Sequence, residues 1–170
     1  MSRFSADWLA LREPYDLQAR NPAVLDAVIA WCKDVFAIRI VDLGCGTGST
    51  LRALARRLPG RQNWQFFDND FELVARAAAI RPPATVTVTA TPLDLARDLE
   101  AALDGSIDLI TTSALLDLVS ESWLERLVVE ISARSIPLYA AISQRRTNRN
   151  CSLRSVRHDD CRGGEFASAH

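Results

Sequence analysis

Helix-like and strand-like segments alternate along the first 142 residues, and this order leaves few folds open to the chain. The helix-like segments repeat apolar residues three and four positions apart, whereas the strand-like segments are short apolar runs. Such runs are typical of parallel strands that are buried on both faces of a sheet. The expected strands are 37–43, 64–68, 85–90, 107–112 and 136–142, and the expected helices are 22–36, 50–58, 71–80, 93–103 and 121–132. We therefore predict an α/β fold with a Rossmann-like, doubly wound and mostly parallel sheet.

The composition favours a globular protein over a membrane protein or a disordered chain. Apolar residues make up 48% and charged residues 24% of the 170 positions, close to the average of folded domains. No apolar run approaches the ~20 residues that cross a bilayer, and the first residues lack the uninterrupted apolar stretch of a secretion signal. The formal net charge is −1, which disfavours a nucleic acid partner because phosphate binding needs a basic surface.

The four cysteines indicate a reducing compartment. They form no Cys-x-x-Cys pair and no dense framework of the kind that secreted, disulfide-rich domains carry. We therefore expect reduced thiols and a cytoplasmic protein. The cysteines are Cys32, Cys45, Cys151 and Cys161.

The last 28 residues differ from the rest of the sequence. Residues 143–170 contain 6 arginines against 3 acidic residues, and only 7 of them are apolar. We expect residues 1–142 to form the domain, with 1–21 as a lid over one end of the sheet, and 143–170 to be a disordered, arginine-rich tail. The tail holds four side chains that can bind zinc, Cys151, His158, Cys161 and His170. Their spacing does not match a zinc knuckle, so no metal site is expected.

A glycine-rich loop follows the first expected strand and points to a ligand site. The segment IVDLGCGTGST, residues 40–50, runs from the strand through Asp42 into glycines at every second position and then into a helix. Ligands of open α/β sheets lie beyond the carboxyl ends of the strands, and glycines let the backbone approach a ligand closely. The helix that follows presents free N–H groups and a positive dipole end. The three glycines are Gly44, Gly46 and Gly48.

An acidic residue at the end of the next strand fits the ribose of a nucleoside ligand. Asp68 lies 20 residues after Gly48, where a carboxylate accepts hydrogen bonds from both ribose hydroxyls. Asp70 is the alternative for this role, although it also fits the N-cap of the following helix. A nicotinamide dinucleotide site stays open as well, but its GxGxxG pattern requires glycine where this sequence has Ser49.

The segment VDLGCGTGS resembles the first motif of class I S-adenosylmethionine-dependent methyltransferases, hydrophobic-(Asp/Glu)-x-Gly-x-Gly-x-Gly. The resemblance implies that S-adenosylmethionine is the cofactor and that methyl transfer is the activity. It assigns the methionine part of the cofactor to Asp42 and the glycine loop, in which Cys45 fills space and is no nucleophile. It assigns the ribose to Asp68 with Asn69, and the adenine to Asp94 and Leu95.

The same resemblance places the methyl acceptor at the end of the fourth strand. Ser113 and Asp117 in the run TTSALLD are the acceptor-side candidates. Arg20 and Tyr15 are candidates to reach the methionine carboxylate from the lid, with a solvated helix face as the alternative. The acceptor is a small molecule or a macromolecule that the sequence does not identify.

The resemblance ends near residue 142. The family's sheet has seven strands, the last two of which form a hairpin, and here the arginine-rich tail stands in their place. We therefore expect the C-terminal strands to be missing or altered, through a truncation or a shifted reading frame. Such a change leaves the edge of the fifth strand open, which favours self-association. It also leaves a second hypothesis open, that the chain is a non-catalytic or truncated cofactor-binding protein of the same fold.

Overall fold

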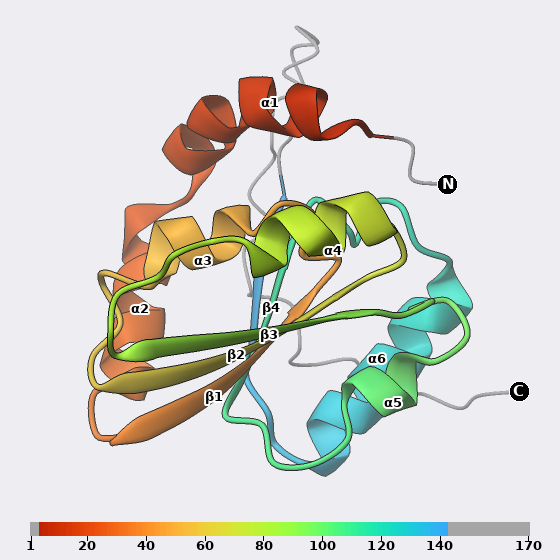
Figure 1. Ribbon diagram of the computed structural model, residues 1–170. Helices are drawn as coiled ribbons and strands as arrows, with labels where there is room; N and C mark the ends of the chain where they lie inside the picture. The colour runs from red at the N-terminus through yellow and green to blue at the C-terminus, as the bar shows by residue number, and fades with distance from the viewer. Residues whose placement is uncertain (1–3, 143–170) are drawn as a thin grey trace, which may run out of the picture.

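Five parallel strands form the central sheet in a computed structural model, which describes residues 4–142 (Figure 1). The strands are β1 (Ala37–Leu43), β2 (Arg61–Asp68), β3 (Val86–Pro92), β4 (Leu109–Ser113) and β5 (Leu138–Ala141). Their order in the sheet is β3-β2-β1-β4-β5. The chain therefore builds outward from β1 to β3 and then returns to the other side of β1. This reversal makes the doubly wound α/β sheet that the sequence predicts.

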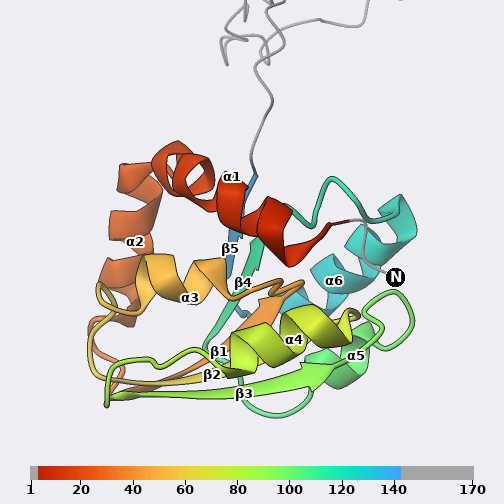
Figure 2. The same cartoon turned by 45° about the horizontal axis from the view of Figure 1, so that its top comes forward.

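Helices cover both faces of this sheet (Figure 2). The helices of the described residues are α1 (Ala6–Ala19), α2 (Pro22–Cys32), α3 (Ser49–Leu54), α4 (Phe71–Ala78), α5 (Leu99–Ala102) and α6 (Glu121–Ala133). Helices α2, α3 and α4 pack on one face, and α5 and α6 pack on the other. Helix α1 contributes no large buried side chain to either core, and it lies above α3 and α4 in both views.

Strand β1 shows why both faces must be covered. Its alternate side chains Ile38 and Ile40 enter the core beneath α2 and α3, whereas Val41 and Leu43 enter the core beneath α5 and α6. All four are almost fully buried. Because side chains alternate along a strand, a continuous apolar run has to be buried on two sides. This is the physical basis of the fold that the sequence predicts.

Several helices begin at the capping residues that their sequences provide. The side chains of Ser5, Asn21 and Ser120 accept hydrogen bonds from backbone N–H groups in the first turns of α1, α2 and α6. Asp70 accepts from two N–H groups in the first turn of α4. Such bonds satisfy donors that have no partner within the helix. Asp70 is therefore occupied as an N-cap, which leaves Asp68 as the carboxylate at the strand end.

The expected helix over 93–103 is wrong for most of its length, because only Leu99–Ala102 is helical. Two side chains of α6 donate hydrogen bonds to the backbone carbonyls of residues 95–97, which precede this short helix. Trp123 Nε1 donates to the carbonyl of Leu95 at 2.6 Å, and Arg126 donates to the carbonyls of Ala96 and Arg97. These tertiary hydrogen bonds take the place of hydrogen bonds within a helix, so residues with a helical apolar pattern form a turn instead.

Strand β2 begins three residues earlier than the apolar run predicts. Its first residues, Arg61 and Gln62, are polar, yet they pair with β1 from Ala37 onward. The buried side-chain amide of Gln62 donates to the carbonyls of Ala55 and Leu58. These are carbonyls at the end of the α3 segment that have no helical partner. A polar residue is thus buried here because it satisfies the backbone of a neighbouring element.

The edge strands of the sheet are β3 and β5. The expectation for the arginine-rich tail at 143–170, and for the strands that it replaces, lies outside the described residues. Among residues 4–142, no helix combines the length and the apolar character that a membrane span requires.

Candidate active site

A cavity of about 610 Å³ opens at the carboxyl ends of the strands. Its floor is the glycine loop after β1, its sides are the ends of β2 and β4 and the loop after β3, and α1 lies over it. The start of α6 closes the remaining side. Nine of the residues singled out in the sequence line this cavity: Gly44, Cys45, Gly46, Asp68, Asn69, Asp94, Leu95, Ser113 and Asp117. The fold thus brings together residues that are up to 73 positions apart in the sequence.

The glycine loop turns sharply and leaves room above it. Gly44 and Gly46 have φ angles of 66° and 53°, a region that favours glycine. The N–H groups of Gly44 and Cys45 both donate to the carbonyl of Phe67 at 2.9 and 3.1 Å. The N–H of Gly46 donates to Asp68 at 2.9 Å. The loop is therefore fixed by the end of β2, and its backbone forms the cavity floor.

Gly48 has a packing role. It is the N-cap of α3 with a φ angle of 82°. A Cβ atom at this position would lie 2.4 Å from Cδ1 of Ile80 and 3.4 Å from Phe66. Gly48 does not line the cavity. Because it has no side chain, α3 can pack closely against Ile80, which follows α4.

Asp68 presents a nearly buried carboxylate to the cavity. The residue is 9% exposed. Its Oδ2 accepts from the N–H of Gly46 at 2.9 Å, and its Oδ1 accepts from the N–H of Asp70 at 3.0 Å. Burial raises the pKa of Asp68, and these two hydrogen bonds lower it in part. Each carboxylate oxygen keeps further acceptor capacity, so a ligand with two adjacent hydroxyl groups fits this position.

The loop after β3 supplies the next wall. Asp94 accepts from the N–H of Ala96 at 3.0 Å, which fixes a tight turn. Leu95 is 8% exposed, and its carbonyl is held by Trp123. Asn69, which follows Asp68 in the sequence, also lines the cavity. A carboxylate beside an apolar side chain suits a flat, polar-edged ring such as a purine base.

Two sequence candidates, Asp42 and Arg20, are buried behind the cavity rather than in its lining. Asp42 accepts from Thr111 Oγ1 at 2.8 Å, and its Oδ2 has no hydrogen-bond partner among the described residues. Arg20 donates to the hydroxyl of Tyr139 at 3.1 Å and to Ser113 Oγ at 3.5 Å, and its Nε has no such partner.

These buried charges interact with each other. Burial raises the pKa of Asp42 to about 7, while the Thr111 hydrogen bond and the positive charge of Arg20 lower it in part. Arg20 lines a smaller cavity of about 150 Å³ together with Ser113 and Tyr139. Tyr15, by contrast, is 73% exposed and lines neither cavity.

Replacing Asp42 with Asn is expected to remove a loss of stability that the native protein undergoes as the pH rises from about 4 to about 7. Because the pKa of Asp42 is higher in the folded state than its ordinary value of 3.8, its contribution to stability is complete below pH 4 and is lost as the pH rises through 7. A difference of about three pKa units corresponds to at most about 4 kcal/mol. Urea unfolding of both proteins between pH 5 and pH 8.5 measures this. The free energy of unfolding of the variant, relative to that of the native protein, should increase as the pH rises to about 7 and then stay constant.

Asp108→Asn is the matched control for this experiment. Asp108 lies at the opposite end of the sheet, and the hydrogen bonds and charge of Arg39 lower its pKa. Its contribution to stability is therefore lost only as the pH falls below about 4, so between pH 5 and pH 8.5 the Asp108→Asn curve should run parallel to that of the native protein. An Asp42→Asn curve that runs parallel to that of the native protein across the whole range contradicts the buried-charge interpretation.

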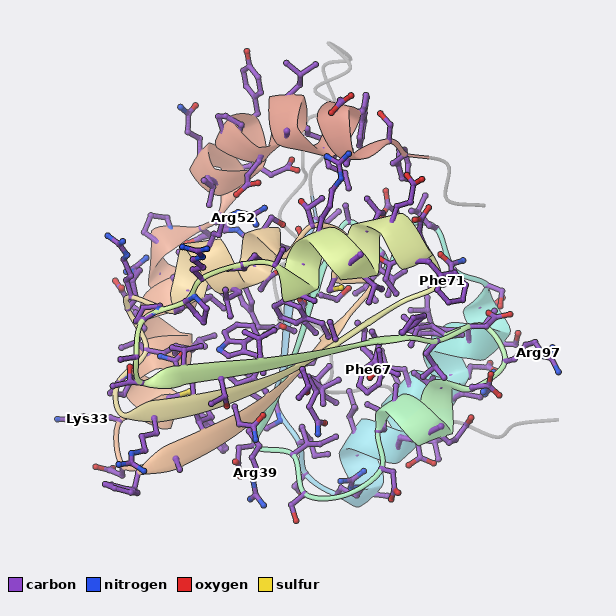
Figure 3. The ribbon with its side chains drawn as sticks, in the orientation of Figure 1. Lys33, Arg39, Arg52, Phe67, Phe71 and Arg97 are labelled. Carbon is purple, nitrogen blue, oxygen red and sulfur yellow. The ribbon has the colours of Figure 1, made fainter. Side chains whose placement is uncertain are left out.

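Helix α1 brings residues to the site that the sequence did not single out. Arg52 of α3 donates to both carboxylate oxygens of Glu13 at 2.5 Å, and also to the carbonyl of Thr47 in the glycine loop at 2.6 Å. Figure 3 shows Arg52 on α3, on the side that faces α1. Trp8 and Arg12 of α1 also line the cavity, with the guanidinium 5.0 Å from the tryptophan ring. No local pattern marks the Arg52–Glu13 contact, because it joins segments 39 positions apart that only the tertiary fold makes neighbours.

The fold and the cavity together define a doubly wound α/β protein with a nucleoside-sized site at the switch point of its sheet. Residues 40–135 match the family model of a methyltransferase domain. This match spans more than half of the chain, so the chain belongs to the methyltransferase domain family. The resemblance to class I S-adenosylmethionine-dependent methyltransferases is thereby confirmed.

Two curated relatives share part of this region. The release factor glutamine methyltransferase of Gloeobacter violaceus is 37% identical over 76 residues, which are 38% of this chain and 27% of that protein. The biotin biosynthesis bifunctional protein BioCD of Bordetella avium is 39% identical over 75 residues, 44% of this chain and 15% of that protein. The matched region is thus little more than a quarter of the first relative and a smaller part of the second.

A solved structure shows the same fold. It belongs to a Methanococcus maripaludis protein described as an S-adenosyl-L-methionine-dependent methyltransferase. The TM-score is 0.55 with 14% sequence identity, and the alignment covers 84% of this chain and 68% of that one.

Proposed function

We propose that this protein binds S-adenosylmethionine in the 610 Å³ cavity and transfers its methyl group to an acceptor. The observation that carries the proposal is the convergence of the glycine loop, Asp68 and Asp94 on this one cavity beneath α1. Membership of the methyltransferase domain family supports it.

The residues present fit this cofactor. The glycine loop provides a floor in which Gly44 and Gly46 carry no side chain and so let a ligand approach the backbone. Asp68 suits the ribose, and Asp94 with Leu95 suits the adenine. Asp42 and Arg20 remain the candidates for the methionine part through their charge, because Asp42 Oδ2 and Arg20 Nε have no partner among the described residues but lie buried behind the cavity lining. We keep Cys45 as a part of the loop that shapes the floor, and Gly48 as the residue that lets α3 pack beside Ile80 and so supports the loop.

When bound, S-adenosylmethionine supplies a methyl group that its sulfonium already makes electrophilic. The protein then has to align the acceptor and exclude water, and alignment alone contributes up to roughly 7–11 kcal/mol. Helix α1, held by the Arg52–Glu13 ion pair, covers the cavity and limits water access. Ser113 and Asp117 line its acceptor side. Residues 1–142 contain no histidine, so the domain is suited to acceptors that need no imidazole base.

We keep the acceptor open between a small molecule and a macromolecule. We also propose a cytoplasmic location, which is supported by the free, buried thiols of Cys32 and Cys45. Burial raises the pKa of Cys45 far above its ordinary value, so this thiol stays protonated and is not a nucleophile. The boundaries 1–142 for the domain and 1–21 for its lid are part of the same proposal.

A thermal melt with ligands tests the proposal directly. S-adenosylmethionine or S-adenosylhomocysteine at 100 times its dissociation constant stabilises the folded protein by about 2.7 kcal/mol, so the midpoint should rise by several degrees. NAD is the matched comparison, because the same glycine-rich topology with a different spacing binds it. A cooperative melt that neither adenosyl ligand shifts, or that NAD shifts instead, rejects the cofactor assignment.

A further inference from the structure

We propose that β5 is an interface strand, which pairs with β5 of a second copy of this chain in antiparallel orientation. Strand β5 is the last strand of the sheet next to β4. Among the described residues, no strand pairs with its outer side. An unpaired strand edge presents a row of free backbone donors and acceptors to another strand.

The hydrogen bonds to β4 fix which backbone groups point outward. Ile110 N–H donates to the carbonyl of Pro137, and Ala114 N–H donates to the carbonyl of Ala141. Backbone groups alternate in direction along a strand. The N–H and carbonyl groups of Leu138, Ala140 and Ile142 therefore point away from β4.

Exposed apolar side chains lie beside this edge, next to the polar residues Asp16, Arg20 and Asn21 that line the same small cavity. Ile142 is 52% exposed, and it lines the small cavity together with Val24 of α2, which is 47% exposed. Leu138 is packed against the core beneath α6. β5 itself carries no charged side chain, so the charge that natural edges use against pairing is missing.

A second copy fits this edge better than the chain's own continuation does. The residues that directly follow Ile142, SQRRTNRN, contain no apolar side chain and three arginines, so they cannot supply an apolar strand to the edge. Around a two-fold axis the outward groups complement each other. Ala140 faces its own counterpart, and Leu138 faces Ile142 of the second copy. Such an interface is isologous, as in most soluble dimers.

Amide hydrogen exchange by NMR on the full chain, at low and high protein concentration, tests this pairing without using ligand binding. The amides of Tyr139 and Ala141 point toward β4 and should be protected at both concentrations. The amides of Leu138, Ala140 and Ile142 should gain protection at least tenfold at high concentration. Sedimentation equilibrium on the same samples should show a dimer.

Two variants separate the edge from other surfaces. Ala140→Pro removes only an outward N–H, a position where edge strands tolerate proline, and it should weaken dimerisation at least tenfold. Ala140→Val keeps that N–H and should dimerise like the native chain. Ile142→Asp provides a second route to a monomer by adding a charge beside the two-fold axis.

Three results would overturn the proposal. One is a monomer at every concentration, and another is a dimer that survives in both Ala140→Pro and Ile142→Asp. The third is protection of the outward amides that does not depend on concentration, which would mean that the chain covers its own edge. Because none of these readouts involves S-adenosylmethionine, they are independent of the proposed function.

Discussion

Replacing Asp68 with Asn is expected to weaken the binding of S-adenosylhomocysteine by about 100-fold. A hydrogen bond to a charged acceptor contributes about 1.5–3 kcal/mol, and a loss of about 3 kcal/mol corresponds to about two orders of magnitude in affinity. The substitution also disturbs the loop, because both carboxylate oxygens already accept backbone N–H groups, from Gly46 and Asp70. Whichever way the amide of Asn is oriented, its NH₂ group faces one of these donors. Isothermal titration calorimetry measures the effect.

Asp34→Asn is the matched control for charge. Asp34 is exposed and lies in the turn after α2, outside the lining of the cavity. This variant should bind the ligand like the native protein. A melt of the Asp68→Asn variant without ligand separates a binding defect from unfolding. If a folded Asp68→Asn variant binds with native affinity, the ribose assignment is wrong.

Replacing Gly60 with Ala is expected to lower the free energy of unfolding by about 3 kcal/mol. Gly60 has a φ angle of 69°, which costs an L-residue roughly 1–2 kcal/mol. An added Cβ would lie 2.8 Å from the carbonyl oxygen of Phe36. The same carbonyl accepts the N–H of Arg61 at 3.1 Å, at the point where β2 starts to pair with β1. The alanine therefore moves backbone and weakens a hydrogen bond worth about 1 kcal/mol.

Gly105→Ala isolates the conformational part of this cost. Gly105 has a similar φ angle of 79°, but an added Cβ meets no atom within 4 Å. The expected loss is about 1 kcal/mol. Chemical denaturation of the two variants under one condition gives the difference. Equal losses in the free energy of unfolding for Gly60→Ala and Gly105→Ala would show that the contact with Phe36 does not destabilise the folded protein.

The sequence predicts the helices and strands well where the pattern is strong and local. A short apolar run placed β1 on the residues that form it, Ala37–Leu43, and similar runs placed the other strands to within a few residues. The capping signal at Asp70 is also local, since the side chain bonds to N–H groups two and three residues later. Patterns of this kind are readable because the residues that interact are close in sequence.

The candidate site was predictable for a related reason. Parallel strands end at one edge of a sheet, so residues that follow strands β1 to β4 are brought together whatever the details of packing. This is why Asp68, Asp94 and Ser113 line one cavity. The sequence did not reveal that Asp42 and Arg20 are buried behind that cavity, because their burial depends on contacts with distant strands: Asp42 with Thr111 of β4, and Arg20 with Ser113 and Tyr139 at the ends of β4 and β5.

The sequence by itself determined the fold class, the order of its elements, the glycine loop and the carboxylates at the strand ends. Each of these follows from spacing along the chain or from the geometry common to all parallel sheets. Only the tertiary structure decided that α5 shrinks to one turn, that Gln62 is buried against α3, that Arg52 holds α1, and that β5 has an open outer side among the described residues. These features depend on contacts between segments far apart in sequence, where a tertiary hydrogen bond or packing contact outweighs the local preference of either partner.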